Sequence, residues 1–179
     1  AANNVAVGYQ ASYSNTTGSG LTSVGYQALT ANTTGSENTA IGRNALSSNT
    51  TGAYNVALGR QALGAATTSG NNVAVGYYSL GAGTLTGSEN TSVGSSALRN
   101  ATTGSNNTAV GYLGLNDNTT GASNTAVGHS ALLENTEGFK NTAIGQGALE
   151  GNTTGDNLTA VGQAALGDNT TANNNTAVG

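Results

Sequence analysis

A short motif closed by glycine recurs along the whole chain, and its fixed interval is the feature that most constrains the fold. The glycine returns every 17 residues, except for one interval of 18 residues between Gly76 and Gly94. The repeating unit can be written N-T-A-V-G-x-x-A-L-x-x-N-T-T-G-x-x. Such a period is typical of a solenoid, in which each repeat is one structural unit stacked on its neighbours. The closing glycines are Gly8, Gly25, Gly42, Gly59, Gly76, Gly94, Gly111, Gly128, Gly145, Gly162 and Gly179.

Each repeat holds two short apolar patches separated by polar turns. The first patch is NTAVG or a variant, such as NVAVG at 4–8, and the second is Ala-Leu, as at 45–46. Between them, Asn-Thr-Thr-Gly supplies residues that tolerate tight turns and positive φ. A 17-residue unit is too short for the helix pair of helical repeats, and a disordered chain has no reason to keep its apolar positions in phase. The sequence therefore predicts an all-β fold, a parallel β-solenoid of about ten 17-residue coils, in a single domain spanning 1–179.

Equivalent residues of successive coils should stack about 4.7 to 4.8 Å apart, which makes a rod about 50 Å long. We expect Val24, Ile41 and Leu58 to form one internal ladder. The 18-residue unit, with GAGTLTG at 81–87, should bulge outward and leave the ladders in register. The structural ladders are predicted to contain Leu29, Leu46, Leu63, Leu98, Leu115, Leu132, Leu149 and Leu166, with Asn38, Asn107, Asn124 and Asn141.

The small residue at the centre of the first patch, such as Ala40, Ala109 or Ala126, indicates close approach of another layer. That layer is either another chain of an oligomer or the far wall of the same coil. We expect the oligomer contact.

The motif NNVAVG at 3–8 and 71–76 resembles the N-S-V-A-I-G signature of the YadA-like head repeats of trimeric autotransporter adhesins, and related repeats occur in viral tail fibres. The resemblance extends over the whole chain, once per unit. It implies a left-handed parallel β-roll, three chains packed into a homotrimer, and a surface-exposed fibre. The chain departs from the signature in its longer unit, its N-T-T-G turn and the Thr that usually replaces the first Val, as at Thr39.

Composition narrows the classes of function. A net charge of −4 with four basic residues argues against a nucleic-acid surface, which needs clustered Lys and Arg. No apolar run approaches the roughly 18 residues that span a bilayer, so no membrane insertion is expected in this segment. The absence of cysteine excludes disulfides and thiolate metal sites. Because the chain starts and stops on the motif, we interpret it as a segment of a longer fibre.

The residue inventory predicts no enzyme, no cofactor and no metal site. His129 is the only histidine, and the equivalent position in other coils holds Tyr, Arg, Ser or Gln, which indicates a solvent-facing site. The acidic residues fall in or near turns, and we interpret them as solvated and not as a calcium ladder. They are Glu37, Glu89, Asp117, Glu134, Glu137, Glu150, Asp156 and Asp168.

The threonine-rich turns suggest two further hypotheses, ice or ligand binding and N-glycosylation. A flat Thr/Asn-rich face could bind ice or another ligand, although adjacent threonines such as Thr33 and Thr34 need not share a face. The turns also create possible N-glycosylation acceptors. These are Asn15, Asn32, Asn49, Asn118, Asn152 and Asn169.

Together these features predict a structural or adhesive extracellular fibre segment, located on a cell or virion surface. The expected partners are copies of the chain itself, as a homotrimer or an end-to-end filament, and host or cell-surface receptors or glycans. The alternative is an ice- or ligand-binding solenoid.

Overall fold

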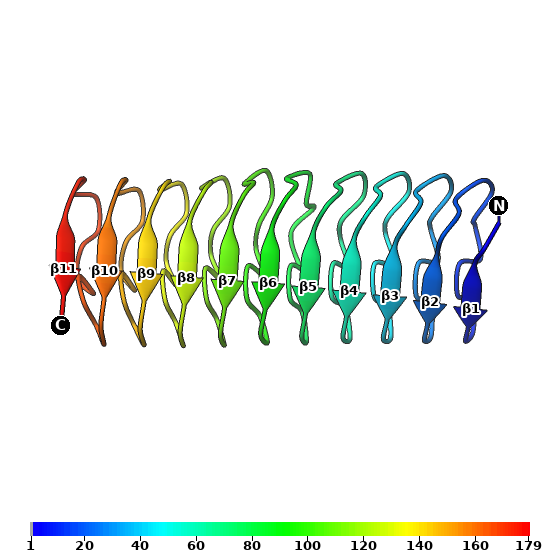
Figure 1. The fold of residues 1–179 in the computed structure, drawn as a ribbon, viewed down its shortest axis with the longest axis horizontal. Helices are drawn as coiled ribbons and strands as arrows, with labels where there is room; N and C mark the ends of the chain where they lie inside the picture. Colours follow the sequence, from blue (N-terminus) through cyan, green and yellow to red (C-terminus); the bar gives the residue numbers. More distant parts are fainter. Residues whose placement is uncertain (1) are drawn as a thin grey trace.

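One circuit of backbone forms each repeat, and the circuits follow one another in a row, with the N-terminus at one end and the C-terminus at the other (Figure 1). The computed structural model describes residues 2–179. Each repeat contributes one three-residue strand, and the strands pair in parallel and in chain order as one 11-stranded sheet. The predicted all-β parallel solenoid is confirmed. The strands are β1 (Val5–Val7), β2 (Thr22–Val24), β3 (Thr39–Ile41), β4 (Val56–Leu58), β5 (Val73–Val75), β6 (Thr91–Val93), β7 (Thr108–Val110), β8 (Thr125–Val127), β9 (Thr142–Ile144), β10 (Thr159–Val161) and β11 (Thr176–Val178).

Neighbouring coils are in register around the whole circuit. In the sheet, Ala40 pairs with Ala57, one repeat further along the chain. Outside the sheet, the Leu46 N–H donates to the Ala62 carbonyl oxygen at 2.9 Å. Hydrogen bonds between coils therefore run through the turns as well as the strands, and each repeat is held by its neighbours.

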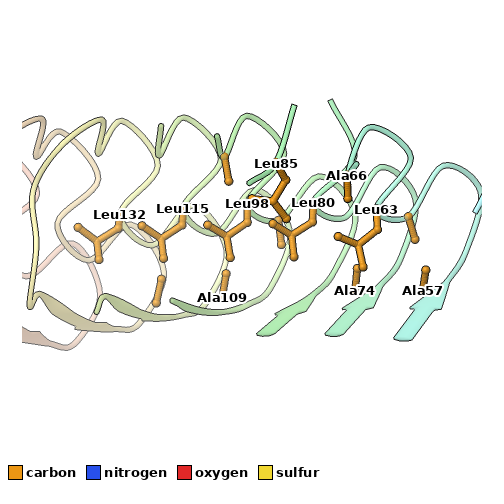
Figure 2. Packing of buried hydrophobic residues seen from close by; sticks show 14 of the residues in the cluster. Ala57, Leu63, Ala66, Ala74, Leu80, Leu85, Leu98, Ala109, Leu115 and Leu132 are labelled. Atoms are coloured by element: carbon orange, nitrogen blue, oxygen red, sulfur yellow. The ribbon is translucent and has the colours of Figure 1, made fainter. Parts of the chain in front are cut away.

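The interior is narrow and is filled from two sides. Leucines that lie four residues after the closing glycine, such as Leu63 and Leu115, point across the coil toward the central alanines of the strands, such as Ala74 and Ala109 (Figure 2). These leucines and alanines are fully buried. Because the leucines fill most of the interior, only a small side chain fits opposite them.

The predicted internal ladder of Val24, Ile41 and Leu58 is wrong. Ile41 is 42% exposed, and Val24 and Leu58 are only partly buried. Side chains alternate along a strand, so a small central residue that faces inward forces both of its branched neighbours outward.

The expectation that the central alanines contact another chain is also wrong. Ala40, Ala109 and Ala126 are fully buried within the one chain and belong to the same core as the leucines. The layer that approaches them is the far wall of their own coil.

The 18-residue coil, between β5 and β6, differs in part from its prediction. The strands stay in register, with Ala74 opposite Ser92. Within the segment that was expected to bulge outward, Ala82 and Thr84 are exposed, but Leu85 is fully buried. Leu85 turns inward and joins the core near Ala66 (Figure 2).

The sharp corners depend on unusual backbone conformations. The closing glycine Gly128 has φ of +141°, and a Cβ there would lie 2.5 Å from the Gly145 carbonyl oxygen of the next coil. The ladder leucines also have positive φ, 52° at Leu132. A left-handed conformation costs a non-glycine residue about 1–2 kcal/mol, which burial of a leucine side chain, about 1.5–3 kcal/mol, offsets.

Candidate functional surfaces

The leucine ladder lies entirely inside the coils. All the predicted members are fully buried except Leu166, which is partly buried near the C-terminal end. Leu80 occupies the same place in the 18-residue coil and was missed, although its offset from Gly76 is the same as in the other coils. These side chains serve packing and are not accessible to a ligand.

A first ladder of asparagines, the strand asparagine ladder, lies just before the strands. The Asn107 amide nitrogen donates to the Gly121 carbonyl oxygen at 2.9 Å and to Asn90 Oδ1 at 3.1 Å, and Asn107 Oδ1 accepts the backbone N–H of Asn124 at 3.0 Å. Each amide thus satisfies backbone groups of its own and neighbouring coils. The buried members are Asn38, Asn55, Asn72, Asn90, Asn107, Asn124 and Asn141.

A second ladder, the turn asparagine ladder, is built from the asparagine of the N-T-T-G turns. The Asn135 amide nitrogen donates to Asn118 Oδ1 at 2.7 Å and to the Gly138 carbonyl oxygen at 3.1 Å. The ladder is interrupted where Ala66, Leu85 and Ala101 form a buried apolar stretch. At its edge, among the described residues, Asn49 Oδ1 is buried without a hydrogen-bond partner.

This second ladder includes the possible glycosylation acceptors. Asn32, Asn49, Asn118 and Asn152 are fully buried, and each donates its amide nitrogen to a carbonyl oxygen three residues ahead or to the neighbouring asparagine. A glycan on that nitrogen is incompatible with the folded coil. Asn15 and Asn169, nearer the two ends, are partly buried and donate similarly.

The titratable residues are spread along the described part of the chain, as His129 illustrates. His129 is exposed, and its nearest aromatic neighbour is Tyr112, with ring centroids 5.3 Å apart. Across residues 2–179, no three His, Cys, Asp or Glu side chains are close enough together to hold a metal ion.

A shallow depression in the last coils is lined by Glu134, Glu150 and Asp168 beside three glycines. All eight acidic residues are exposed or partly buried, as expected. No helix long and apolar enough to cross a bilayer occurs in the described part of the chain.

The outer face of the sheet carries two rows of side chains, and we call it the outer sheet face. One row, of Thr or Val, comes from the first residue of each strand, and the other, of Val, Ile or Leu, from the last residue. In the second row, Val110 is 38% and Ile144 42% exposed. The most exposed members of that row are Val7, Ile41, Val93, Val110, Val127, Ile144 and Val178.

A further exposed row borders the outer sheet face. It is formed by the residue that directly follows the closing glycine of each coil. In the first five coils it consists of planar side chains, and we call it the tyrosine–arginine row: Tyr9, Tyr26, Arg43, Arg60 and Tyr77. The Tyr9 and Tyr26 rings stack with centroids 5.2 Å apart and planes 17° apart. The guanidinium carbon of Arg43 lies 5.8 Å from the Tyr26 centroid, and that of Arg60 lies 5.4 Å from the Tyr77 centroid.

The threonines of the turns do not form a double row of free hydroxyls. The first threonine of the pair donates its hydroxyl to a backbone carbonyl oxygen of the next coil, as Thr33 does to Thr50 at 3.0 Å. The second threonine, such as Thr34, is exposed. One row is therefore engaged in holding the coils together, and only the other faces solvent freely.

Comparison with protein families, curated proteins and solved structures finds no match to this chain.

Proposed function

We propose that the chain is a rigid, non-enzymatic segment of an extracellular fibre, in which three copies pack side by side through the outer sheet face. The observation that carries this proposal is the row of branched apolar side chains along that face. It continues through every coil, and most of its members are more than a third exposed. Soluble monomers rarely expose such continuous apolar strips, which usually mark interaction surfaces.

Stiffness follows from the way the coils are joined. Backbone hydrogen bonds, a leucine ladder and two asparagine ladders all run parallel to the rod axis. Bending the rod would stretch several of these ladders at once. A length of about 50 Å, set by strand spacing, suits a spacer that holds a binding region away from a surface.

The three-fold arrangement agrees with the resemblance to YadA-like head repeats. Each copy offers one face with a continuous row of branched apolar side chains beside a row of Thr and Val, and three such faces can close around a common axis, as cyclic symmetry requires. Placement on a cell or virion surface follows from the same resemblance and belongs to the proposal.

Ice binding, the alternative, is favoured less by this geometry. It requires a flat array of free hydroxyls, whereas the first threonine of the turn pair donates to backbone carbonyls. Thermal hysteresis at high protein concentration would support it against the fibre.

Sedimentation equilibrium tests the fibre proposal. Val110→Glu with Ile144→Glu places two charges on the outer sheet face. The control, Thr120→Glu with Thr154→Glu, places two charges on the exposed turn row, where Glu137 already occupies the equivalent position. We expect the native chain and the control to sediment as trimers and the outer-face variant as a folded monomer. A monomeric native chain, or an outer-face variant that remains trimeric, would overturn the proposal.

A further inference from the structure

We propose that the tyrosine–arginine row is a binding site for an acidic glycan, a sugar chain that carries carboxylates. This inference rests on the proposed function, because it names the ligand class of an adhesive fibre.

The row is a continuous strip of planar groups on consecutive coils. Tyr9 stacks on Tyr26. Arg43 lies over the Tyr26 ring, and Arg60 lies over the Tyr77 ring. Five coils at the strand spacing cover about 19 Å. The strip is therefore long enough for an oligosaccharide and not only for a single sugar.

The two arginines contact tyrosine rings of their own chain, but those contacts leave their guanidinium charges without a carboxylate partner. They occupy equivalent positions in the turns of neighbouring coils, and like charges side by side repel each other. Neither forms an ion pair with a carboxylate of residues 2–179, and later coils hold the neutral Gln146 and Gln163 at the same place. Adjacent, unpaired guanidinium groups offer forked donors that match a carboxylate.

The tyrosines supply the second half of the chemistry of sugar recognition. Tyr9 is 62%, Tyr26 47% and Tyr77 45% exposed. An exposed ring can pack against the apolar C–H face of a sugar while its hydroxyl forms a hydrogen bond. These rings therefore offer stacking surfaces on both sides of the charged pair.

An amide row runs beside this strip and adds donors and acceptors for sugar hydroxyls. The Gln27 amide nitrogen donates to Gln10 Oε1 at 2.9 Å, and the Asn44 amide nitrogen donates to Gln27 Oε1 at 3.3 Å. Aromatic rings, amides and guanidinium groups thus lie together on one edge of the rod.

Charge distribution favours a glycan over a nucleic acid. The row ends at Tyr77, and residues 101–179 contain one basic residue, Lys140, and six acidic ones. A nucleic acid, with a phosphate at every nucleotide, needs a continuous positive groove. An oligosaccharide with a few carboxylates needs only the local pair of arginines.

Isothermal titration with an oligoglucuronate tests the site, beside the same oligosaccharide with its carboxylates reduced to alcohols and a single-stranded oligonucleotide of equal length. Arg43→Gln and Arg60→Gln use a residue that the same position holds in other coils. Lys140→Gln removes the same charge outside the row. We expect each arginine variant to weaken binding of the oligoglucuronate at least tenfold, Lys140→Gln to change it less than twofold, and the reduced sugar to bind at least tenfold more weakly.

Three outcomes would overturn the inference. The native chain could fail to bind the oligoglucuronate, the arginine variants could bind it as the native chain does, or the oligonucleotide could bind more tightly. Sedimentation of the same samples separates this inference from the proposed function. A trimer that binds no acidic sugar refutes the glycan site alone, and a monomer that binds it through Arg43 and Arg60 refutes the assembly alone.

Discussion

Replacing Gly128 by alanine tests the close approach of neighbouring coils. The φ of +141° lies in a region that only glycine adopts readily, at a strain of about 1–3 kcal/mol for other residues. The new Cβ would lie 2.5 Å from the Gly145 carbonyl oxygen and 2.7 Å from its carbonyl carbon. These are backbone atoms, so no side chain can rotate away, and the coils must separate. The Gly128 N–H donates to the Val110 carbonyl oxygen at 2.8 Å, and weakening that bond and its neighbour adds about 1 kcal/mol each.

We therefore expect Gly128→Ala to lower the free energy of unfolding by about 3–5 kcal/mol, measured by urea denaturation followed by circular dichroism. Gly114→Ala is the matched control in the adjacent coil. Its Cβ would meet Ala109 Cβ at 3.7 Å, an ordinary contact, and other coils hold alanine at this position, such as Ala131. That variant should match the native chain or gain up to about 1 kcal/mol. Equal losses for both variants, or no loss at Gly128, would refute the reasoning.

Six further substitutions, arranged as four tests, probe the interior and the surface by the same unfolding assay. Leu132→Ala should lower the free energy of unfolding by about 2–5 kcal/mol, because it leaves a cavity in the leucine ladder. Leu133→Ala should lower it clearly less, because the Leu133 side chain is only partly buried. Equal losses would contradict the assignment of Leu132 to the buried ladder. Asn135→Ala should lose about 2–4 kcal/mol because Asn118 Oδ1 loses its donor and the Gly138 carbonyl loses one of its two donors, keeping only the Asn124 amide nitrogen. A neutral result would contradict the turn asparagine ladder. The stability losses of Ser79→Ala and Ser92→Ala should be non-additive, with a coupling energy of at least about 0.5 kcal/mol, because the two hydroxyls are hydrogen-bonded at 2.6 Å. Additive losses would contradict this hydrogen bond. His129→Ala should change stability by less than about 0.5 kcal/mol, and a larger loss would assign this exposed residue a structural role.

The period of the repeat was sufficient to predict the architecture. One repeat per coil, parallel pairing and an inward leucine follow from the 17-residue interval and from the need of each coil to bury its leucine against its neighbours. Leu46 and Leu132 occupy equivalent positions in their repeats, and the structure buries both fully.

The face that each strand turns inward could not be predicted from the strand itself. In Thr-Ala-Ile at 39–41, alternation allows either the central alanine or its two neighbours to face inward, and hydrophobicity favours the larger residues. The choice is made by Leu46 and its equivalents, which approach from the opposite wall and leave room only for alanine. The three residues of the strand contain no sequence pattern that indicates this contact with the opposite wall of the coil.

The burial of the turn asparagines was not predicted, for a similar reason. An N-T-T-G sequence is typical of a surface turn, yet Asn118 and Asn152 point inward. A signal was present in the repeats themselves, because the same position holds Ala66 and Ala101 beside the inserted Leu85. Small apolar replacements at a position otherwise occupied by asparagine indicate an interior site. The surface tyrosine–arginine row was visible in the sequence, but its stacking geometry was not.

Distances between spin labels on different copies test the central claim, side-by-side packing through the outer sheet face, most directly. The chain has no cysteine, so a single introduced cysteine carries the only label. One sample is labelled at Val127→Cys on the outer sheet face and the other at Thr120→Cys on the turn row, and pulsed electron paramagnetic resonance measures distances between copies. We predict a distinctly shorter distance between copies for position 127 than for position 120. The reverse order, or no signal between copies at either position, would contradict the account.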